Sequence, residues 1–202
     1  MDVYKQVQTA YDKMVLEYAK RNHFNMADNL VVLGHELIQH VGQNGSLVDI
    51  GCGTGRDMAW FESRGVTITG IDLSMGMLVY ARENVHGNLV SMNMRHLGFP
   101  NAYFDGAWCC ASLLHLPKTE AALTLHEIRR ILRSGGILIL SIQEGNGESW
   151  EDSYVPGIKR FFARYQDDEM RNILSKNRFA ILKADSSQEV DRKWLSFVCI
   201  AE

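Results

Sequence analysis

Three alternating glycines follow an apolar segment that carries one acidic residue. Gly51, Gly53 and Gly55 come directly after the apolar run that begins at Leu47 and contains Asp49, and a helical pattern follows them. A strand, a glycine turn and a helix in this order direct backbone N–H groups and a helix N-terminus toward an anionic or polar ligand. Glycine tolerates the positive φ of such a turn and adds no Cβ between backbone and ligand. The stretch therefore predicts a ligand site, with a turn that binds nothing as the alternative.

The spacing of these glycines distinguishes two classes of nucleotide site. A dinucleotide-binding fingerprint has glycine at its first, third and sixth positions, the last one beside the pyrophosphate. In this chain the sixth position is Arg56, and the third glycine comes one residue early, at Gly55. The pattern therefore disfavours a nicotinamide-dependent (NAD) oxidoreductase, which stays the least favoured alternative.

A second carboxylate, Asp72, ends the β-branched segment that starts at Val66. The segment is typical of a second strand, and an acid at its end can accept hydrogen bonds from both hydroxyls of a ribose. The alternative is that Asp72 caps a helix beginning near Met75, although Ser74 could cap that helix alone. Because the glycine turn precedes it, ribose binding is the favoured role.

One histidine is expected at the edge where the parallel strands end. The segment from Phe104 to Ala111 predicts a fourth strand that runs into Ser112–Pro117. Ligands of an open parallel sheet bind at the carboxyl ends of its strands, so residues from Cys110 to His115 should line that cleft. His115 is the side chain there that exchanges a proton near neutral pH. A general base and a structural hydrogen-bond donor are both open to it.

Composition and charge describe an ordinary single-domain protein. The chain has 202 residues, 46% of them hydrophobic, and a formal net charge of −3 with acidic and basic residues interspersed. This gives no basic footprint for nucleic acid or anionic membranes, and we expect neither a signal peptide nor a membrane-spanning segment. The four cysteines (52, 109, 110 and 199) form no CxxC pair, and the seven histidines lack metal-ligand spacing. We therefore expect a cytoplasmic protein with free thiols and no metal site.

Hydrophobic periodicity and the positions of glycine give the remaining elements. Helical patterns cover about 4–18, 26–41, 56–64, 75–82, 119–132 and 169–176, and strand patterns cover about 47–50, 66–72, 88–92, 104–111, 137–142, 179–184 and 194–201. We expect Asp28 or a nearby polar residue to cap the second helix. Gly135 and Gly136 are expected to end the helix before them, and residues 185–193 to form a hairpin loop.

Two segments are suited to covering the cleft. The first helix places Tyr11 and Tyr18 where a lid over a cofactor could lie, with core packing as the alternative. Residues 144–165 predict an irregular insertion, rich in glycine and aromatic residues. Its side chains, among them Tyr154 and Arg160, are expected either to pack in a core or lid or to contact a substrate.

Taken together, these motifs resemble the class I S-adenosylmethionine (SAM)-dependent methyltransferases, in their small form that consists of the methyltransferase domain only. The motifs that carry the resemblance are Asp49–Gly55, Gly70–Ser74 with Met77, Phe104–Asp105, and Glu127 with Arg130 and Gly136. The resemblance implies an α/β fold, Rossmann-like and doubly wound. Its mostly parallel sheet would have about seven strands, an antiparallel C-terminal hairpin and helices on both faces. Residues 1–202 would form one domain, with 1–42 as an N-terminal helical lid and 144–165 as an insertion over the cleft.

The resemblance also implies which residues hold SAM. These are Tyr11, Asp49, Gly51, Cys52, Gly53, Gly55, Asp72, Leu73, Met77, Asn93, Met94, Cys110 and Ala111. Asp49 would lie near the amino-acid part of the cofactor and Asp72 would hold its ribose. Leu73 and Met94 would flank the adenine, and Asn93 would face its amino group. Asn93 stands where the family usually has aspartate, so its side-chain carbonyl would accept that hydrogen bond without charge assistance.

The implied activity is that of an enzyme that transfers a methyl group from SAM to an oxygen, nitrogen or sulfur atom of a small molecule, leaving S-adenosylhomocysteine. Alignment of the acceptor with the methyl group would supply most of the catalysis, with His115 as base where a proton must leave. The absent motifs of amino-group DNA methyltransferases, arginine methyltransferases and metal-dependent catechol enzymes disfavour those subclasses. The alternative is a SAM-binding regulator or partner protein that no longer transfers methyl groups. The expected partners are a small-molecule acceptor, no nucleic acid and no membrane, in a monomer or homodimer.

Overall fold

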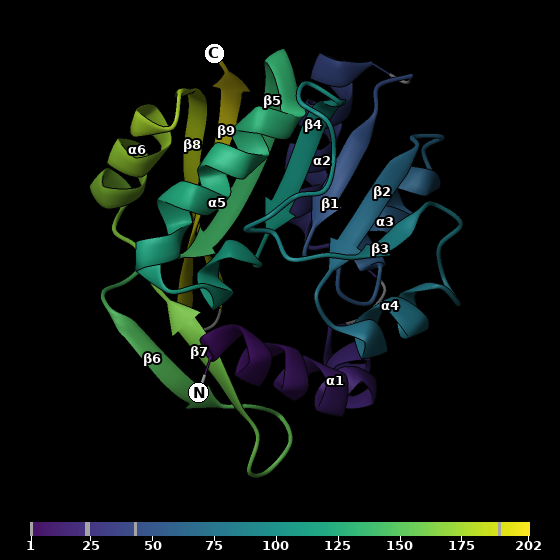
Figure 1. Ribbon diagram of the computed structural model, residues 1–202, viewed down its shortest axis with the longest axis vertical. Coiled ribbons are helices and arrows are strands. Elements are labelled where there is room, and N and C mark those ends of the chain that lie inside the picture. Colours follow the sequence, from purple (N-terminus) through teal and green to yellow (C-terminus); the bar gives the residue numbers. More distant parts are fainter. Residues whose placement is uncertain (1, 23–24, 43, 190) are drawn as a thin grey trace.

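A seven-stranded sheet forms the centre of the protein, with strand order β3-β2-β1-β4-β5-β9-β8 (Figure 1). The computed structural model describes residues 2–22, 25–42, 44–189 and 191–202. The strands of this sheet are β1 (Leu47–Ile50), β2 (Ile68–Asp72), β3 (Leu89–Ser91), β4 (Phe104–Cys110), β5 (Leu132–Gln143), β8 (Phe179–Glu189) and β9 (Arg192–Ala201). The first five are parallel, and β9 is antiparallel to both β5 and β8. The predicted doubly wound α/β fold with an antiparallel C-terminal hairpin is confirmed.

Helices cover both faces of the sheet because its central strands are apolar on both sides. The helices are α1 (Val3–Arg21), α2 (Asp28–Val41), α3 (Arg56–Glu62), α4 (Met75–Ala81), α5 (Lys118–Ile131) and α6 (Asp167–Lys176), with a short 3₁₀ turn, η1, at Leu113–His115. Trp108 faces the cluster that contains side chains of α2, α3 and α4, whereas its neighbour Cys109 faces the cluster built with α5 and α6. Alternate residues of β4 thus supply two separate cores.

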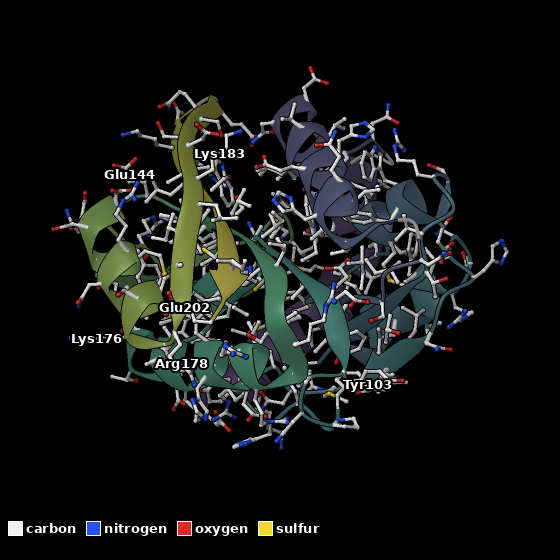
Figure 2. All side chains as sticks on the ribbon, turned by 90° about the horizontal axis from the view of Figure 1, so that it is seen from above. Tyr103, Glu144, Lys176, Arg178, Lys183 and Glu202 are labelled. Atoms are coloured by element: carbon white, nitrogen blue, oxygen red, sulfur yellow. The ribbon has the colours of Figure 1, made fainter. Side chains whose placement is uncertain are left out.

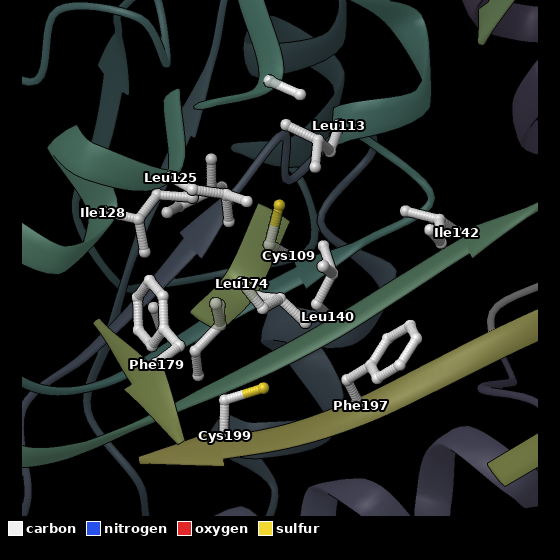
Figure 3. Packing of buried hydrophobic residues seen from close by; sticks show 14 of the residues in the cluster. Cys109, Leu113, Leu125, Ile128, Leu140, Ile142, Leu174, Phe179, Phe197 and Cys199 are labelled. Carbon is white, nitrogen blue, oxygen red and sulfur yellow. The ribbon is translucent and has the colours of Figure 1, made fainter. Parts of the chain in front are cut away.

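The core under α5 and α6 is shown from close by in Figure 3. Leu125 and Ile128 of α5 and Leu174 of α6 pack toward Cys109 and Leu140 of the sheet (Figure 3). All five side chains are fully buried. Each buried leucine or isoleucine contributes roughly 1.5–3 kcal/mol relative to an exposed position, so this layer fixes the sheet against the two helices.

The insertion at residues 144–165 differs from its prediction as an irregular segment. Residues Glu148–Asp152 (β6) and Lys159–Ala163 (β7) form an antiparallel hairpin outside the main sheet (Figure 1). Trp150 pairs across the hairpin with Phe161, and their rings meet edge to face at 5.5 Å. The glycines that favoured irregular structure lie outside both strands. They therefore shape the ends of the hairpin and do not interrupt the hydrogen-bonded ladder between β6 and β7.

Three further local predictions are wrong. The loop expected over 185–193 is mostly strand, because the β8–β9 ladder continues to the pair Glu189 and Arg192, and an edge strand tolerates polar side chains on its solvent face. Helix α5 ends when Leu132 turns extended, so Gly135 and Gly136 do not stop a helix; they lie in an irregular part of β5. Ala27 precedes α2 without any side-chain cap.

Figure 2 views the molecule from above and shows how the C-terminal strands close one edge of the sheet. Glu202 and Arg178 lie side by side in this view, and the Glu202 backbone N–H donates to the Arg178 carbonyl oxygen at 3.0 Å. Lys183 of the edge strand β8 forms an ion pair with Glu36 of α2. The first contact joins the residues that flank β8 and β9, and the second ties β8 to a helix.

Helix α1 crosses the end of the sheet to which the parallel strands point (Figure 1). Its Asp12 carboxylate accepts hydrogen bonds from the Ser74 hydroxyl at 2.6 Å and the Gly76 backbone N–H at 2.9 Å. The Gln8 amide donates to the Leu73 carbonyl oxygen at 3.0 Å. An acid at the first turn of α4 satisfies an otherwise unpaired N–H group, and here that acid comes from another helix. Among the described residues, no helix is both long and apolar enough to span a membrane.

Candidate active site

A cavity of about 430 Å³ lies at the carboxyl ends of the parallel strands, between the sheet, α1 and the β6–β7 hairpin. Twelve of the predicted site residues are part of its wall: Tyr11, Asp49, Gly51, Cys52, Gly53, Asp72, Leu73, Asn93, Met94, Cys110, Ala111 and His115. The position agrees with the rule that open α/β sheets bind ligands at the point where the strand order reverses, here between β1 and β4.

Two predicted residues do not line the cavity. Gly55 is the N-cap of α3, and a Cβ added there would meet Val85 and Ala81 at 3.0–3.1 Å, so this glycine permits helix packing. Met77 is buried inside α4, where its backbone N–H donates to Ser74. Because that bond makes Ser74 the cap of α4, the side chain of Asp72 is not needed as one.

The glycine turn after β1 has two sides with different constraints. Gly51 has φ 80°, and a Cβ on it would lie 2.4 Å from Cβ of Ser112, so only glycine fits between β1 and the segment after β4. Gly53 has φ 53°, and a Cβ on it would meet nothing within 4 Å. The turn is therefore packed tightly underneath and open on the cavity side, as backbone that lies against a ligand must be.

Asp72 is held in place by the backbone around it. One carboxylate oxygen accepts from the Gly53 N–H at 2.9 Å and the other from the Ser74 N–H at 2.8 Å. Burial raises the pKa of Asp72, while these N–H groups oppose the rise. A carboxylate has about four acceptor positions, so two hydrogen bonds leave room for two more from a ligand.

Asp49 is a buried carboxyl group of the cavity wall that belongs to none of the ion pairs of the described residues. Its Oδ2 atom is buried and has no hydrogen-bond partner among the described residues. Burial raises the pKa of Asp49 well above its ordinary value, and the nearby carboxylates of Asp57 and Asp72 add to the rise. Asp57 is itself satisfied, since it accepts from Trp108 Nε1 at 2.9 Å and from Arg56 Nε at 2.6 Å. A buried carboxylate oxygen without a donor is a site for a cationic ligand group.

The segments after β3 and β4 both line the cavity. Asn93 already accepts a hydrogen bond at its side-chain oxygen from the Arg95 backbone N–H, at 3.1 Å. At the end of β4, burial raises the pKa of the Cys110 thiol well above its ordinary range, so the thiol stays neutral. Ala111 has φ 54°, a conformation that costs a non-glycine residue about 1–2 kcal/mol. This backbone conformation turns the chain sharply after β4 and places Ala111 on the cavity wall.

His115 and Tyr11 form a hydrogen-bonded pair on the cavity wall. His115 Nδ1 donates to the Phe161 carbonyl oxygen at 2.7 Å, because a carbonyl can only accept. The neutral ring therefore has its lone pair on Nε2, which accepts from the Tyr11 hydroxyl at 2.6 Å. Burial lowers the pKa of His115 to about 4, with repulsion from Arg160 adding to the shift. Burial also raises the pKa of Tyr11. At neutral pH the pair is uncharged, and both residues line the cavity.

Several wall residues were not predicted as ligand contacts. Glu189, Arg192 and Trp194 come from the ends of β8 and β9, in or next to the stretch expected to be a loop. A polar stretch that ends in tryptophan is a weak signal, and only the observed hairpin brings it to the cavity. Arg160 and Tyr154, for which substrate contact was one of the two expected roles, do line the cavity, whereas Trp150 is not part of its wall and contacts Phe161. No cluster of metal-ligating side chains occurs among residues 2–22, 25–42, 44–189 and 191–202.

Comparison with known proteins identifies the family. The methyltransferase domain model matches residues 48–140. The O-methyltransferase rstn1 of Aspergillus nomiae is 30% identical over 179 residues, which cover 77% of this chain and 76% of that protein. The chain belongs to the class I SAM-dependent methyltransferases. The predicted family is thereby confirmed.

The fold agrees with solved structures of other methyltransferases. The 1,6-didemethyltoxoflavin-N1-methyltransferase of Burkholderia thailandensis has a TM-score of 0.78 and 19% identity, with 98% of this chain and 88% of that one covered. A malonyl-[acyl-carrier protein] O-methyltransferase of Erwinia pyrifoliae is 32% identical over 142 residues, which cover 63% of this chain and 50% of that protein. This chain spans only 43% to 60% of the length of three of the curated relatives it matches.

Alanine substitutions at Gly51 and Gly53 should have opposite consequences. Gly51→Ala should lower the free energy of unfolding by about 3 kcal/mol, because a strained φ is combined with a clash against Ser112. Gly53→Ala should cost only about 1–2 kcal/mol, because the new methyl group enters open space. Denaturant unfolding measures both. Equal losses of stability would contradict the described asymmetry of the turn.

The folded protein should lose stability through His115 as the pH falls. The pKa of His115 is about 4 in the folded state, below its ordinary 6.5, so the unfolded chain takes up a proton first. The contribution is complete above about pH 6.5 and disappears toward pH 4, with an upper bound of about 3 kcal/mol. Comparing unfolding free energies of the wild type and His115→Gln across this range isolates it from other titrations. The exposed His126→Gln is the control, and parallel pH profiles for wild type and His115→Gln would contradict the prediction.

Proposed function

We propose that the protein binds SAM in this cavity and transfers its methyl group to a small-molecule acceptor. The observation that carries the proposal is the buried Asp49 oxygen without a donor, next to the open face of the glycine turn. The α-ammonium group of SAM would supply the missing donor and the missing positive charge. A regulator without methyl transfer has the same cofactor residues, so activity must be tested separately from binding.

The rest of the cofactor fits the same wall. Asp72 keeps acceptor positions for two ribose hydroxyls after bonding to Gly53 and Ser74. Leu73 and Met94 would flank the adenine, and Asn93 would face its edge. The neutral Cys110 and the strained Ala111 would border the methionine end. Bound there, SAM supplies a methyl group made electrophilic by its sulfonium.

The chain contributes alignment and a place for the acceptor's proton. The cavity wall would hold an acceptor atom in line with the methyl carbon, and SAM would supply the methyl group to it while the sulfur kept the electron pair of the broken bond. If the acceptor is a hydroxyl, its proton passes to the Tyr11 oxygen as the Tyr11 proton passes to His115 Nε2, a distance of 2.6 Å between the heavy atoms. The bond from Nδ1 to Phe161 then holds the imidazolium. Tyr11 is therefore the group that meets the acceptor, and His115 is the base behind it.

The proposed acceptor is small because a cavity of about 430 Å³ would have to hold both it and SAM. Helix α1 and residues 144–165 border the cavity on the side away from the sheet, and we propose that both segments act as its lid. The relatives named as O-methyltransferases favour oxygen as the acceptor atom, and the Burkholderia thailandensis structure holds a small molecule beside S-adenosylhomocysteine. The four cysteines are free thiols in this structure, which favours the cytoplasm as the location of the protein.

Calorimetric titration with S-adenosylhomocysteine, with NADH in a parallel titration, tests the cofactor assignment. S-adenosylhomocysteine should bind and NADH should not. Asp49→Asn should weaken binding roughly 10- to 100-fold, because one charge-assisted hydrogen bond is lost, and Asp72→Ala should do likewise. The exposed Asp168→Asn is the control. If wild-type protein binds no S-adenosylhomocysteine, or if Asp49→Asn binds it equally well, the proposal fails.

Turnover tests the role of the Tyr11–His115 pair. With the acceptor that yields the most S-adenosylhomocysteine in a screen, Tyr11→Phe and His115→Gln should each lower kcat about 100-fold. The double variant should lose no more than either single one, since the two residues act as a unit. Binding of S-adenosylhomocysteine should stay within about threefold. If Tyr11→Phe weakens that binding and leaves kcat intact, Tyr11 is a cofactor contact and not part of the proton path. The exposed Tyr103→Phe is the control.

A further inference from the structure

Arg160 is a buried cation on the cavity wall, and no carboxylate of the described residues is paired with it. Its residue is only 5% exposed, and its Nε atom has no hydrogen-bond partner among the described residues. None of the ion pairs of the described chain includes it. A guanidinium has five N–H donors and is always charged. A buried charge without a counter-ion destabilises a protein. An unpaired guanidinium in a cavity wall therefore indicates a ligand that supplies the counter-ion.

The groups around Arg160 are aromatic or hydroxylic. The guanidinium lies 4.6 Å from the centre of the Tyr154 ring and 5.1 Å from that of Phe162. The hydroxyls of Tyr11 and Tyr154 are its polar neighbours. Cation–π contacts compensate part of the charge, but they satisfy no N–H group in the plane of the guanidinium. Two hydroxyls and two ring faces hold the guanidinium in position and leave donors for a planar anion.

The cavity separates its charges into two regions. The carboxylates of Asp57 and Asp72 both act on Asp49 near the glycine turn, where the cationic cofactor is proposed to bind. Arg160 acts on Tyr11 and His115, the pair assigned to the acceptor, and its effect on Tyr11 is larger than that of Asp72. Arg56, the cation next to the glycine turn, is already paired with Asp57 at 2.6 Å. Arg160 therefore faces the acceptor's side of the cavity.

From this geometry, and resting on the proposed function, we propose that the methyl acceptor is an aromatic carboxylate whose carboxylate group is bound by Arg160. A guanidinium matches a carboxylate with two parallel hydrogen bonds. The rings of Tyr18, Tyr154, Phe162 and Trp194 on the cavity wall suit a flat, unsaturated body. A single carboxylate fits better than a phosphate, since the one positive charge of the Arg160 guanidinium balances one negative charge.

The same contact would couple acceptor binding to the base. Arg160 repels a proton on His115 and so contributes to the lowered pKa of that ring. A carboxylate paired with Arg160 cancels this repulsion, so the His115 pKa rises when the acceptor binds. The imidazole would then accept a proton more readily with an anionic acceptor in place than in the free enzyme.

Matched acid and amide ligands test the inference on protein saturated with S-adenosylhomocysteine. The probes are 4-hydroxybenzoate, caffeate and indole-3-acetate with their neutral amides, and calorimetry reports their affinities. At least one acid should bind wild-type protein 10-fold or more tightly than its amide. Arg160→Met should remove that preference, and Arg160→Lys should keep part of it. Arg164→Met is the matched control, because Arg164 lies near the same Phe162 ring but is paired with Glu151.

The outcomes separate this inference from the proposed function. If S-adenosylhomocysteine binds but no acid binds better than its amide, or if Arg160→Met keeps the preference, the carboxylate site is overturned. If Arg160→Met instead weakens S-adenosylhomocysteine binding 10-fold or more, Arg160 serves the cofactor and the inference is also overturned. Failure of S-adenosylhomocysteine to bind wild type would count against the proposed function itself.

Thermal unfolding without ligand adds a readout independent of binding. Arg160→Met should have an equal or higher Tm, because it removes an unpaired buried charge. A marked fall in Tm would assign Arg160 a structural role.

Discussion

The close approach of β1 and the segment after β4 is the constraint on which the site depends. At this point Gly51 and Ser112 are so near that a Cβ on Gly51 would lie 2.4 Å from the Ser112 side chain. The Ser112 hydroxyl donates to the Ile50 carbonyl oxygen at 2.6 Å and closes the junction. Because the crossover connections leave β1 and β4 in opposite directions, the chain opens a cleft beyond this junction. The junction of Gly51 and Ser112 therefore fixes where the two strand ends that line the cavity begin to diverge.

Charge inside the cavity is the second organising feature. Asp49 and Arg160 are both buried, each keeps an atom without a partner among the described residues, and they belong to different parts of the wall. Unpaired buried charges lower the stability of the folded protein. Proteins retain them mainly in functional sites, where a ligand can neutralise the charge. A cationic cofactor and an anionic acceptor would neutralise the two groups, so bound ligands would complete the electrostatics that the chain leaves open.

Local sequence patterns predicted the elements in which burial and backbone conformation follow a regular pattern along a short stretch of the chain. The strand–glycine turn–helix unit at Asp49–Gly55 and the acid at the end of β2 are encoded within a few residues, and the structure has them where they were expected. The insertion at 144–165 could not be predicted in the same way. Its two strands pair only with each other and are joined by the contact of Trp150 with Phe161. They therefore lack the alternation of apolar and polar residues by which a strand of a sheet with one buried face can be predicted.

The sequence by itself determined the sheet, the glycine turn and the residues at the carboxyl ends of the strands, because each depends on backbone conformation and burial over a short stretch. Only the tertiary structure decided which distant side chains meet. Tyr11 and His115 are 104 residues apart, and their 2.6 Å contact exists because Asp12 and Gln8 hold α1 across the end of the sheet. The isolation of Arg160 was likewise not encoded locally, since a missing counter-ion is a property of all its neighbours in space. Local patterns specify conformation, whereas charge balance and proton paths depend on packing between elements far apart in the chain.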